Sequence, residues 1–194
     1  MIDLTKGPVH ISSGPSSNPN SMCLTLISKT LENGGKVIWM ARRLTDSRKL
    51  SDILGHLRGV DMDRMIVIEF DDKLEENSQN IKKIIPSLKK KDLLIVEDWC
   101  ANYGRVKSKD VNLMKELTEI NKDIQIVITS SSYEDASGEK KGLDGWMARG
   151  EKLLKSRYRT VWMTKIQDQF QKVIITDGEE QKIVNLTQNG FRNN

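Results

Sequence analysis

The stretch from residue 9 to residue 31 constrains this chain most, because its pattern changes twice within a few residues. It begins with a short apolar run, V-H-I-S-S, and continues as a loop of Gly, Pro, Ser and Asn at residues 14–21. Apolar side chains then recur at the spacing of an amphipathic helix, at Leu24, Ile27 and Leu31. The stretch therefore predicts a strand, a tight loop and a helix in succession.

The loop can be aligned with the phosphate-binding pattern G-x-x-x-x-G-K-[ST], which joins a strand to a helix. Gly14 is then the first glycine and Ser21 the metal-binding hydroxyl, whereas Pro19 replaces the second glycine and Asn20 the lysine. Proline has no N–H to offer a phosphate, and a neutral amide cannot supply the charge of the lysine. We interpret the loop as a phosphate loop whose nucleotide site has decayed. The alternative is an ordinary strand-to-helix turn.

Apolar runs and helical patterns alternate through about residue 130, and this alternation sets the expected fold class. Buried strands are expected at residues 36–40, 65–70, 93–97 and 124–129, and helical patterns at 42–59, 75–91 and 109–121. Pro86 should kink or split the helix in which it lies. Strands that alternate with helices indicate βαβ units, so we predict an α/β fold with a mostly parallel twisted sheet flanked by helices.

The pattern changes after residue 130. Residues 130–145 are rich in Ser, Gly and charge and predict a loop, and residues 151–154 predict the end of a short helix. Three strands separated by short polar turns are expected at residues 158–165, 171–177 and 182–187. They predict an antiparallel C-terminal extension of the sheet.

Length and composition bound the class of protein. At 194 residues, the chain is expected to form a single domain over residues 1–194. It has no apolar run of about 20 residues and no signal peptide, so neither a membrane span nor export is predicted. Two cysteines, Cys23 and Cys100, fit a cytoplasmic protein without disulfides. A net charge of +4 permits nucleic-acid binding without specifying it.

Further motifs follow the loop in the order and spacing of one known family. They are an apolar strand closed by two carboxylates, a sensor-like hydroxyl cluster and a glycine pair, at residues 93–98, 129–131 and 142–145. The chain ends on V-N-L-T-Q-N-G-F at residues 184–191. Together with residues 14–21, these motifs resemble the ATPase core of the RecA superfamily, most closely the archaeal RadA and RadB recombinases and their paralogues. The resemblance implies a RecA-like P-loop NTPase fold.

Three parts of the ATPase machinery of that family are altered here. Besides Pro19 and Asn20, the position of the catalytic glutamate reads M-A-R-R at residues 40–43, without a carboxylate. The sensor glutamine is replaced by serine, at Ser130 or Ser131. Because phosphoryl transfer depends on an oriented water and fixed positive charge, we predict no ATP hydrolysis and no tight binding of ATP and Mg²⁺, and we expect no other cofactor.

Candidate metal ligands are few. Ser21, Glu97 and Asp98 could together still hold Mg²⁺, or the two carboxylates simply end a strand beside a crevice. His10 and His56 are isolated in the sequence. Because no Cys/His cluster has the spacing of metal ligands, we predict no structural metal site.

The resemblance also implies two DNA-contact loops, one after the strand at 93–97 and one after the strand at 124–129. Basic side chains gather in these segments, at Arg105, Lys107, Lys109, Lys140, Lys141 and Arg149. Such side chains neutralise phosphates, and an aromatic such as Tyr103 can stack on an unpaired base. Single- or double-stranded DNA is therefore the expected partner, bound mainly through its phosphates. The alternative is a solvated surface of mixed charge, because acidic residues share the second loop.

The four tryptophans fall into two groups. Trp39 and Trp162 lie inside expected strands and are assigned to the core. Trp99 and Trp146 flank the two loops and are candidate anchors for a protein partner, because Trp is enriched at interface hot spots.

Two main classes of function fit these observations. The first is a non-catalytic RecA/RadA-family paralogue that assists DNA recombination or repair by binding DNA, a recombinase or both. The second is a KaiC-like regulatory or scaffold protein without a DNA role, and a weak ATPase is a third reading. Few residues precede the first strand, too few for the linker strand that polymerises recombinase filaments, so we expect a monomer or a homodimer.

Overall fold

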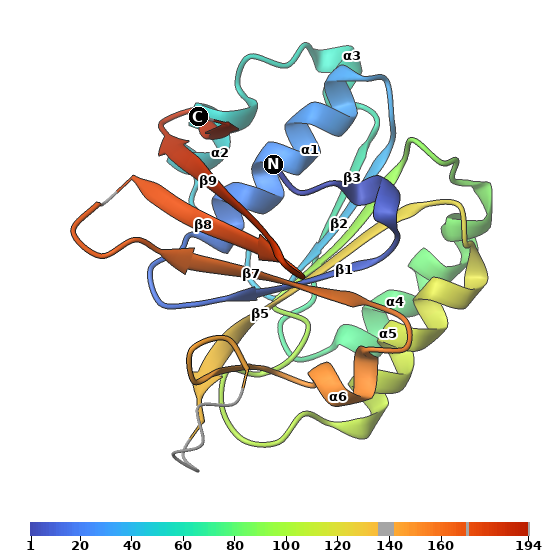
Figure 1. Ribbon diagram of the computed structural model, residues 1–194. Helices are drawn as coiled ribbons and strands as arrows, with labels where there is room; N and C mark the ends of the chain where they lie inside the picture. Colours follow the sequence, from blue (N-terminus) through green and yellow to red (C-terminus); the bar gives the residue numbers. More distant parts are fainter. Residues whose placement is uncertain (136–141, 170, 194) are drawn as a thin grey trace.

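The computed structural model describes residues 1–135, 142–169 and 171–193 (Figure 1). In chain order its strands are β1 (Val9–Ser13), β2 (Val37–Ala41), β3 (Met65–Glu69), β4 (Leu93–Glu97), β5 (Gln125–Glu134), β6 (Trp146–Ala148), β7 (Arg159–Lys165), β8 (Lys172–Asp177), β9 (Glu180–Thr187) and β10 (Gly190–Asn193). They form one 10-stranded sheet in the order β10-β9-β8-β7-β1-β5-β4-β2-β3, and β6 pairs with β5.

Strand direction divides the sheet into two parts. β7, β1, β5, β4, β2 and β3 run parallel, whereas β8, β9 and β10 extend the sheet antiparallel. β1 lies inside the sheet between β5 and β7, and β4 lies between β2 and β5. The predicted fold class is therefore confirmed. Because the carboxyl ends of parallel strands meet at one edge, the loops after β1, β2, β4 and β5 are brought together there.

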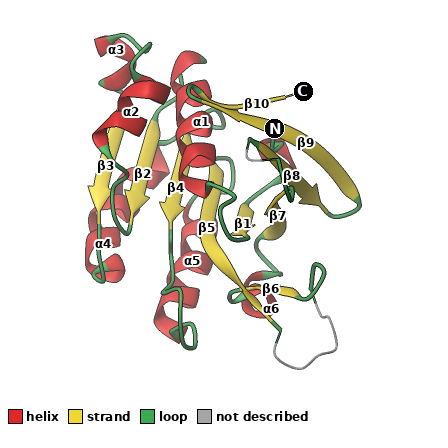
Figure 2. Cartoon of the chain, turned by 90° about the vertical axis from the view of Figure 1, so that its left-hand side faces the viewer, coloured by secondary structure: helices red, strands yellow, loops and turns green. Residues whose placement is uncertain are grey.

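Helices cover both faces of the parallel part (Figure 2). One face carries α1 (Pro19–Glu32), α2 (Ser47–Leu54) and α3 (Gly59–Met62), and the other carries α4 (Leu74–Ile84), α5 (Ser108–Ile120) and α6 (Glu151–Leu154). Two 3₁₀ turns, η1 (Leu4–Lys6) and η2 (Ile85–Ser87), complete the described elements. Every residue of β1, β2 and β4 is buried, as expected for strands covered on both sides.

Alternate side chains of β2 divide the core into two clusters. Trp39 belongs to the cluster under α1, and Ile38 and Met40 belong to the cluster under α4 and α5. The apolar face of α1 lies in the first cluster, at Leu24, Ile27 and Leu31, all fully buried. Each such side chain contributes about 1.5–3 kcal/mol when it is buried. The assignments of Trp39 and Trp162 to buried positions are also confirmed.

The ends of α1 follow from local chemistry. The helix stops at a glycine pair, as predicted: Gly34 has a φ of 71° and donates its N–H to Leu31 O at 2.9 Å. In the middle of the helix, the Thr25 hydroxyl accepts the N–H of Phe191 at 2.9 Å. This bond joins the C-terminal strand to the helix that follows the glycine-containing loop.

Several segments differ in detail from the sequence-based expectation. Residues 130–145 are not loop throughout, because β5 continues to Glu134 and pairs antiparallel with β6. The middle of the pattern at 42–59 is helical as expected and forms α2, whereas α3, which begins at Gly59, and β10 as a separate strand were not foreseen. The expected break at Pro86 is present: α4 ends at Ile84, and a 3₁₀ turn that contains Pro86 follows.

Candidate functional site

The loop after β1 is held by its own short-range hydrogen bonds. Ser17 Oγ donates to Gly14 O at 2.8 Å, and Asn18 Nδ2 donates to Ser16 O at 3.2 Å. Asn18 precedes α1 in the left-handed conformation, with a φ of 57° and no side-chain capping bond. Pro19 is the first residue of the helix, so the helix start presents one N–H fewer to an anion.

The positions of the metal-binding hydroxyl and the lysine lie in the first turn of α1. Ser21 is buried and Asn20 is half-buried. A hollow of about 260 Å³ beside this turn is lined by Ser21 and also by Arg48 and Lys49 of α2. Sequence reasoning missed these two basic residues because they belong to no motif and reach the loop only through the packing of α2 on α1.

The carboxylates that end β4 have different surroundings. Glu97 is 2% exposed, and the indole Nε1 of Trp39 donates to its Oε2 at 2.9 Å. Burial raises the pKa of Glu97 to about 7, with the Trp39 hydrogen bond opposing the rise. Asp98 has a left-handed φ of 52°, and burial raises its pKa while the charge of Arg42 opposes that rise. The Glu97 carboxyl group thus already has a hydrogen-bond donor within the core.

Arg42 occupies the end of β2, where the resembled family carries its catalytic glutamate. Its Nε donates to Asp98 O at 2.9 Å, and its Nη1 donates to Asp71 O at 2.9 Å and Asp72 Oδ1 at 2.6 Å. The guanidinium also lies 5.3 Å from the ring centroid of Phe70. One side chain therefore ties together the segments that follow β2, β3 and β4.

The sensor-like cluster faces inward. The hydroxyl of Thr129 accepts the N–H of Asp98 at 3.0 Å, and Ser130 Oγ is 2.8 Å from His10 Nε2. Burial lowers the pKa of His10 to about 4, so the imidazole is neutral at pH 7. The Trp99 ring packs edge-on against His10 and is fully buried, which corrects the expectation that Trp99 anchors a protein partner. Its place at the start of a loop suggested exposure, but the ring turns into the core.

The predicted DNA-contact residues lie in different settings. Arg105 and Lys107 are exposed, whereas Lys109 forms an ion pair with Glu75 at 3.4 Å beside other acidic side chains of α4. Arg149 is almost completely buried. Lys140 and Lys141 lie outside the described residues. The fold thus brings Arg105 and Arg149 together and places Lys109 on a more acidic surface.

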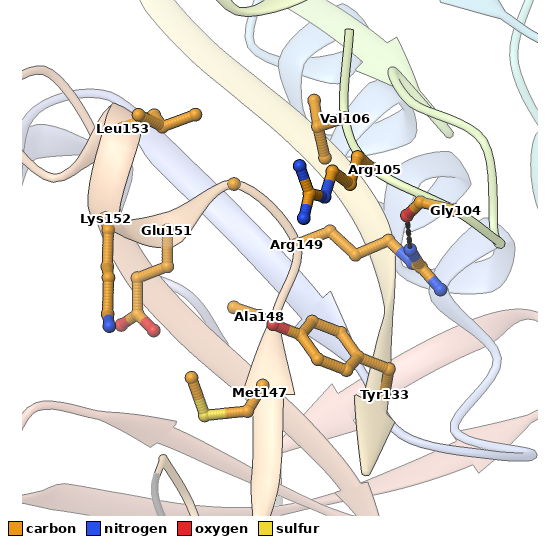
Figure 3. Close-up of a pocket in the computed structure, with 11 residues that line it drawn as sticks. Gly104, Arg105, Val106, Tyr133, Met147, Ala148, Arg149, Glu151, Lys152 and Leu153 are labelled. Atoms are coloured by element: carbon orange, nitrogen blue, oxygen red, sulfur yellow. Dashed lines mark hydrogen bonds between the residues drawn. The ribbon is translucent and has the colours of Figure 1, made fainter. Parts of the chain in front are cut away.

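A largely apolar pocket of about 610 Å³ opens between the loop after β4 and the segment after β6 (Figure 3). Its lining includes Gly104, Arg105, Tyr133, Met147, Arg149 and Lys152. The guanidinium of Arg149 lies 5.3 Å from the ring centroid of Tyr133. Tyr133 and Met147 were not predicted as site residues, because residues 130–145 were expected to be loop and no strand was expected at residue 147.

Two kinds of feature are absent from the described residues. Within the described ranges, no group of three or more His, Cys, Asp or Glu side chains is arranged to hold a metal ion. Over the same ranges, none of the helices combines the length and the apolar character that crossing a membrane requires.

Comparisons with known proteins define the class to which the fold belongs. The sequence matches no protein-family model, and a search of curated proteins finds no relative. Many solved structures nevertheless share the fold. The structure of a DnaB-like replicative helicase is similar over 97% of this chain and 57% of the helicase chain, with a TM-score of 0.64 and 10% identity. The chain therefore has a RecA-like P-loop NTPase fold.

Two further structures are similar over nearly their whole length. A RadB recombinase has a TM-score of 0.70 and 15% identity, with 97% of this chain and 90% of that chain covered. A KaiC-like protein from the archaeon Pyrococcus horikoshii has a TM-score of 0.64 and 11% identity, with 97% and 89% covered. At such identities the likeness defines the fold alone.

Proposed function

We propose that this protein binds nucleic acid, mainly through phosphates, on the surface formed by the loop after β4 and the segment after β6. The observation that carries the proposal is the convergence of Arg105 and Lys152 on one open pocket, although the two lie far apart in the sequence. Among the described residues, neither side chain has an ion pair or a hydrogen bond. Their charge is therefore free to neutralise phosphates, although Glu151 on the same rim offsets part of it.

The corresponding biological role is that of a non-catalytic RecA-like protein that assists DNA recombination or repair, alone or with a recombinase. The likeness to the RadB recombinase supports this role through the fold only. In the described parts of the two loops, no set of Asn, Gln and Arg side chains stands on a rigid element for reading base edges, so binding should depend weakly on sequence. A cytoplasmic location, indicated by two unpaired buried cysteines, remains a prediction.

Fluorescence anisotropy with labelled single- and double-stranded oligonucleotides at several salt concentrations tests the proposal. Arg105→Glu, Lys152→Glu and Lys107→Glu should each weaken binding and flatten the salt slope by about one unit, because each phosphate contact accounts for roughly one. Changing Lys140 and Lys141 together to Glu should flatten it by about two units. Lys29→Glu, on the exposed side of α1, is the matched control. Unchanged affinity in the Arg105 and Lys107 variants would contradict the proposal.

We further infer that the protein neither hydrolyses ATP nor binds it tightly. Support comes from Pro19 at the helix start, from Arg42 in place of a carboxylate, and from the Glu97 carboxyl group, which is already bonded to Trp39. Isothermal titration with Mg-ATP is the test. Micromolar affinity, or turnover that Ser21→Ala abolishes, would show that the site still works and would favour the weak-ATPase alternative.

One surface favours the second class, a regulatory or scaffold protein that binds other proteins. β3 is an edge strand whose Ile66 and Val67 are about two-fifths exposed, and an apolar hollow of about 340 Å³ lies beside it. Such an edge can pair with a strand of another chain. If a homodimer forms there, Val67→Lys should convert it to a monomer in analytical ultracentrifugation, whereas Lys29→Glu should not.

A further inference from the structure

Arg149 connects two parts of the pocket wall. It follows β6, is 9% exposed, and its Nη1 donates to Gly104 O at 3.2 Å while its Nη2 donates to Asn102 O. The guanidinium also stacks near the ring of Tyr133 in β5. Figure 3 shows the side chain extending away from β6 toward Gly104. A single side chain thus links the strand pair β5–β6 to the loop after β4.

The linked segment, residues 100–106, has few other restraints. Among the described residues, the hydrogen bonds that hold this segment come from Arg149. Tyr103 at its tip is 83% exposed. Only its ends pack on the core, through Cys100 and Val106. The conformation of the middle of the segment, and hence the place of Arg105, therefore depends strongly on Arg149.

The next residue strengthens this link. Gly150 has a φ of 68°, and a Cβ atom there would lie 3.0 Å from Cη2 of Trp99, which stands just before the loop. Residues 149 and 150 therefore touch both the tip and the base of the segment. The Nε of Arg149 is buried without a partner. A phosphate could reach this guanidinium only if the loop moved away.

We propose that Arg149 is a positioning residue that couples the two loops and holds Arg105 at the pocket rim, and that it does not itself contact nucleic acid. This inference rests on the proposed function. A planar guanidinium can bridge two carbonyl oxygens, whereas the single ammonium of lysine cannot reproduce that geometry. A phosphate contact, by contrast, would tolerate lysine, because phosphate neutralisation requires mainly the charge.

The experiment compares Arg149→Lys, Arg149→Met, Arg105→Met and the double variant Arg105→Met/Arg149→Met. Binding to a labelled oligothymidine is measured by anisotropy. Both Arg149 variants should lose affinity about equally, by roughly tenfold, because each loses hydrogen bonds from a charged group. In the Arg105→Met background, Arg149→Met should add little, since residues that act through one another are not additive. Wild-type-like affinity for Arg149→Lys, together with a full additional loss in the double variant, would identify Arg149 as a direct contact.

A second measurement needs no nucleic acid. Tryptic cleavage after Arg105 and Lys107, followed by mass spectrometry of the intact chain, reports how often the segment opens. Both Arg149 variants should be cleaved there about tenfold faster than the wild type, with cleavage after Lys29 as the internal reference. Unchanged cleavage would overturn the coupling even if binding falls. If the wild type binds no nucleic acid, the proposed function fails, and the cleavage rates still decide the coupling. If Arg149→Met does not fold, Arg149→Lys and Arg149→Gln carry the comparison.

Discussion

At the edge where the carboxyl ends of the parallel strands meet, two regions differ in whether their polar groups have hydrogen-bond partners. Where β2 and β4 end, the polar groups are paired within the chain. Trp39 Nε1 donates to the Glu97 carboxylate, and Arg42 Nε donates to the carbonyl of Asp98. Beside β6, Arg105 and Lys152 face an open pocket and have no partner among the described residues. The comparison teaches that polar groups at one part of this edge can be paired within the chain, while basic side chains at the neighbouring part keep no partner among the described residues.

The largest loss of stability is expected from a substitution where β2 and β4 end. Arg42→Ala removes the charge-assisted bonds to the carbonyl oxygens of Asp98 and Asp71 and the ion pair with Asp72. Each such bond contributes about 1.5–3 kcal/mol, so the free energy of unfolding should fall by roughly 2–4 kcal/mol in urea titrations. Arg43→Ala is the matched control, because that side chain is 82% exposed and its one ion pair, with Asp71, is long at 3.9 Å. An equal loss in both variants would show that Arg42 does not clamp the strand ends.

A somewhat smaller effect concerns pH and Glu97. Its pKa is raised to about 7, so the folded protein retains a proton that the unfolded chain releases at lower pH. The wild type should therefore lose stability as pH rises from about 4.5 to 7, by up to about 3 kcal/mol from this group. Glu97→Gln keeps an acceptor for Trp39 and should be more stable than the wild type at pH 8, with no advantage below pH ~4.5.

His10 provides the internal check on this prediction. Its pKa is lowered to about 4, so the unfolded chain binds the extra proton and stability falls as pH drops below about 6.5. The two slopes oppose each other in the wild type. Glu97→Gln removes the Glu97 contribution and leaves that of His10, which the raised pKa of Asp98 opposes only at the acid end. Denaturation midpoints of the variant should therefore fall as the pH drops from 8 through 6.5. A flat profile in the variant would mean that His10 does not titrate as its burial implies.

Most of the fold could be predicted from local patterns. Alternating apolar runs placed β1 to β5, and the glycine pair placed the end of α1, because periodicity and backbone freedom are local properties. The continuation of β5 to Glu134 could not be predicted in this way. Polar strands such as S-S-Y-E are stabilised by pairing with a partner strand, here β6, and this pairing is not visible in the apolar pattern of the segment itself.

The site was predicted less completely, for a related reason. Motif positions located Gly14, Ser21 and Glu97, but their partners come from packing between elements. Neither the bond of Trp39 to Glu97 nor the position of Lys49 beside the loop follows from any spacing in the sequence. Arg149 was predicted as a DNA contact from its charge and from its place after the strand at 124–129. Its burial results from the carbonyl groups of a loop more than 40 residues away in sequence.

The smallest loss of stability is expected from a substitution between the pocket and the ends of β2 and β4. Gly150 lies beside the pocket, and the ring of Trp99 beneath it also packs against His10 in the core. Gly150→Ala places a methyl group 3.0 Å from that ring at a φ of 68°, so it should cost about 1–2 kcal/mol through strain and crowding. Gly104→Ala has a similar φ of 71° but open space around it, and it separates the backbone cost from the crowding. If both variants lose the same stability in urea, the Trp99 ring can move away from the added methyl group. The pocket wall would then be less firmly joined to the core than the packing of Gly150 on Trp99 implies.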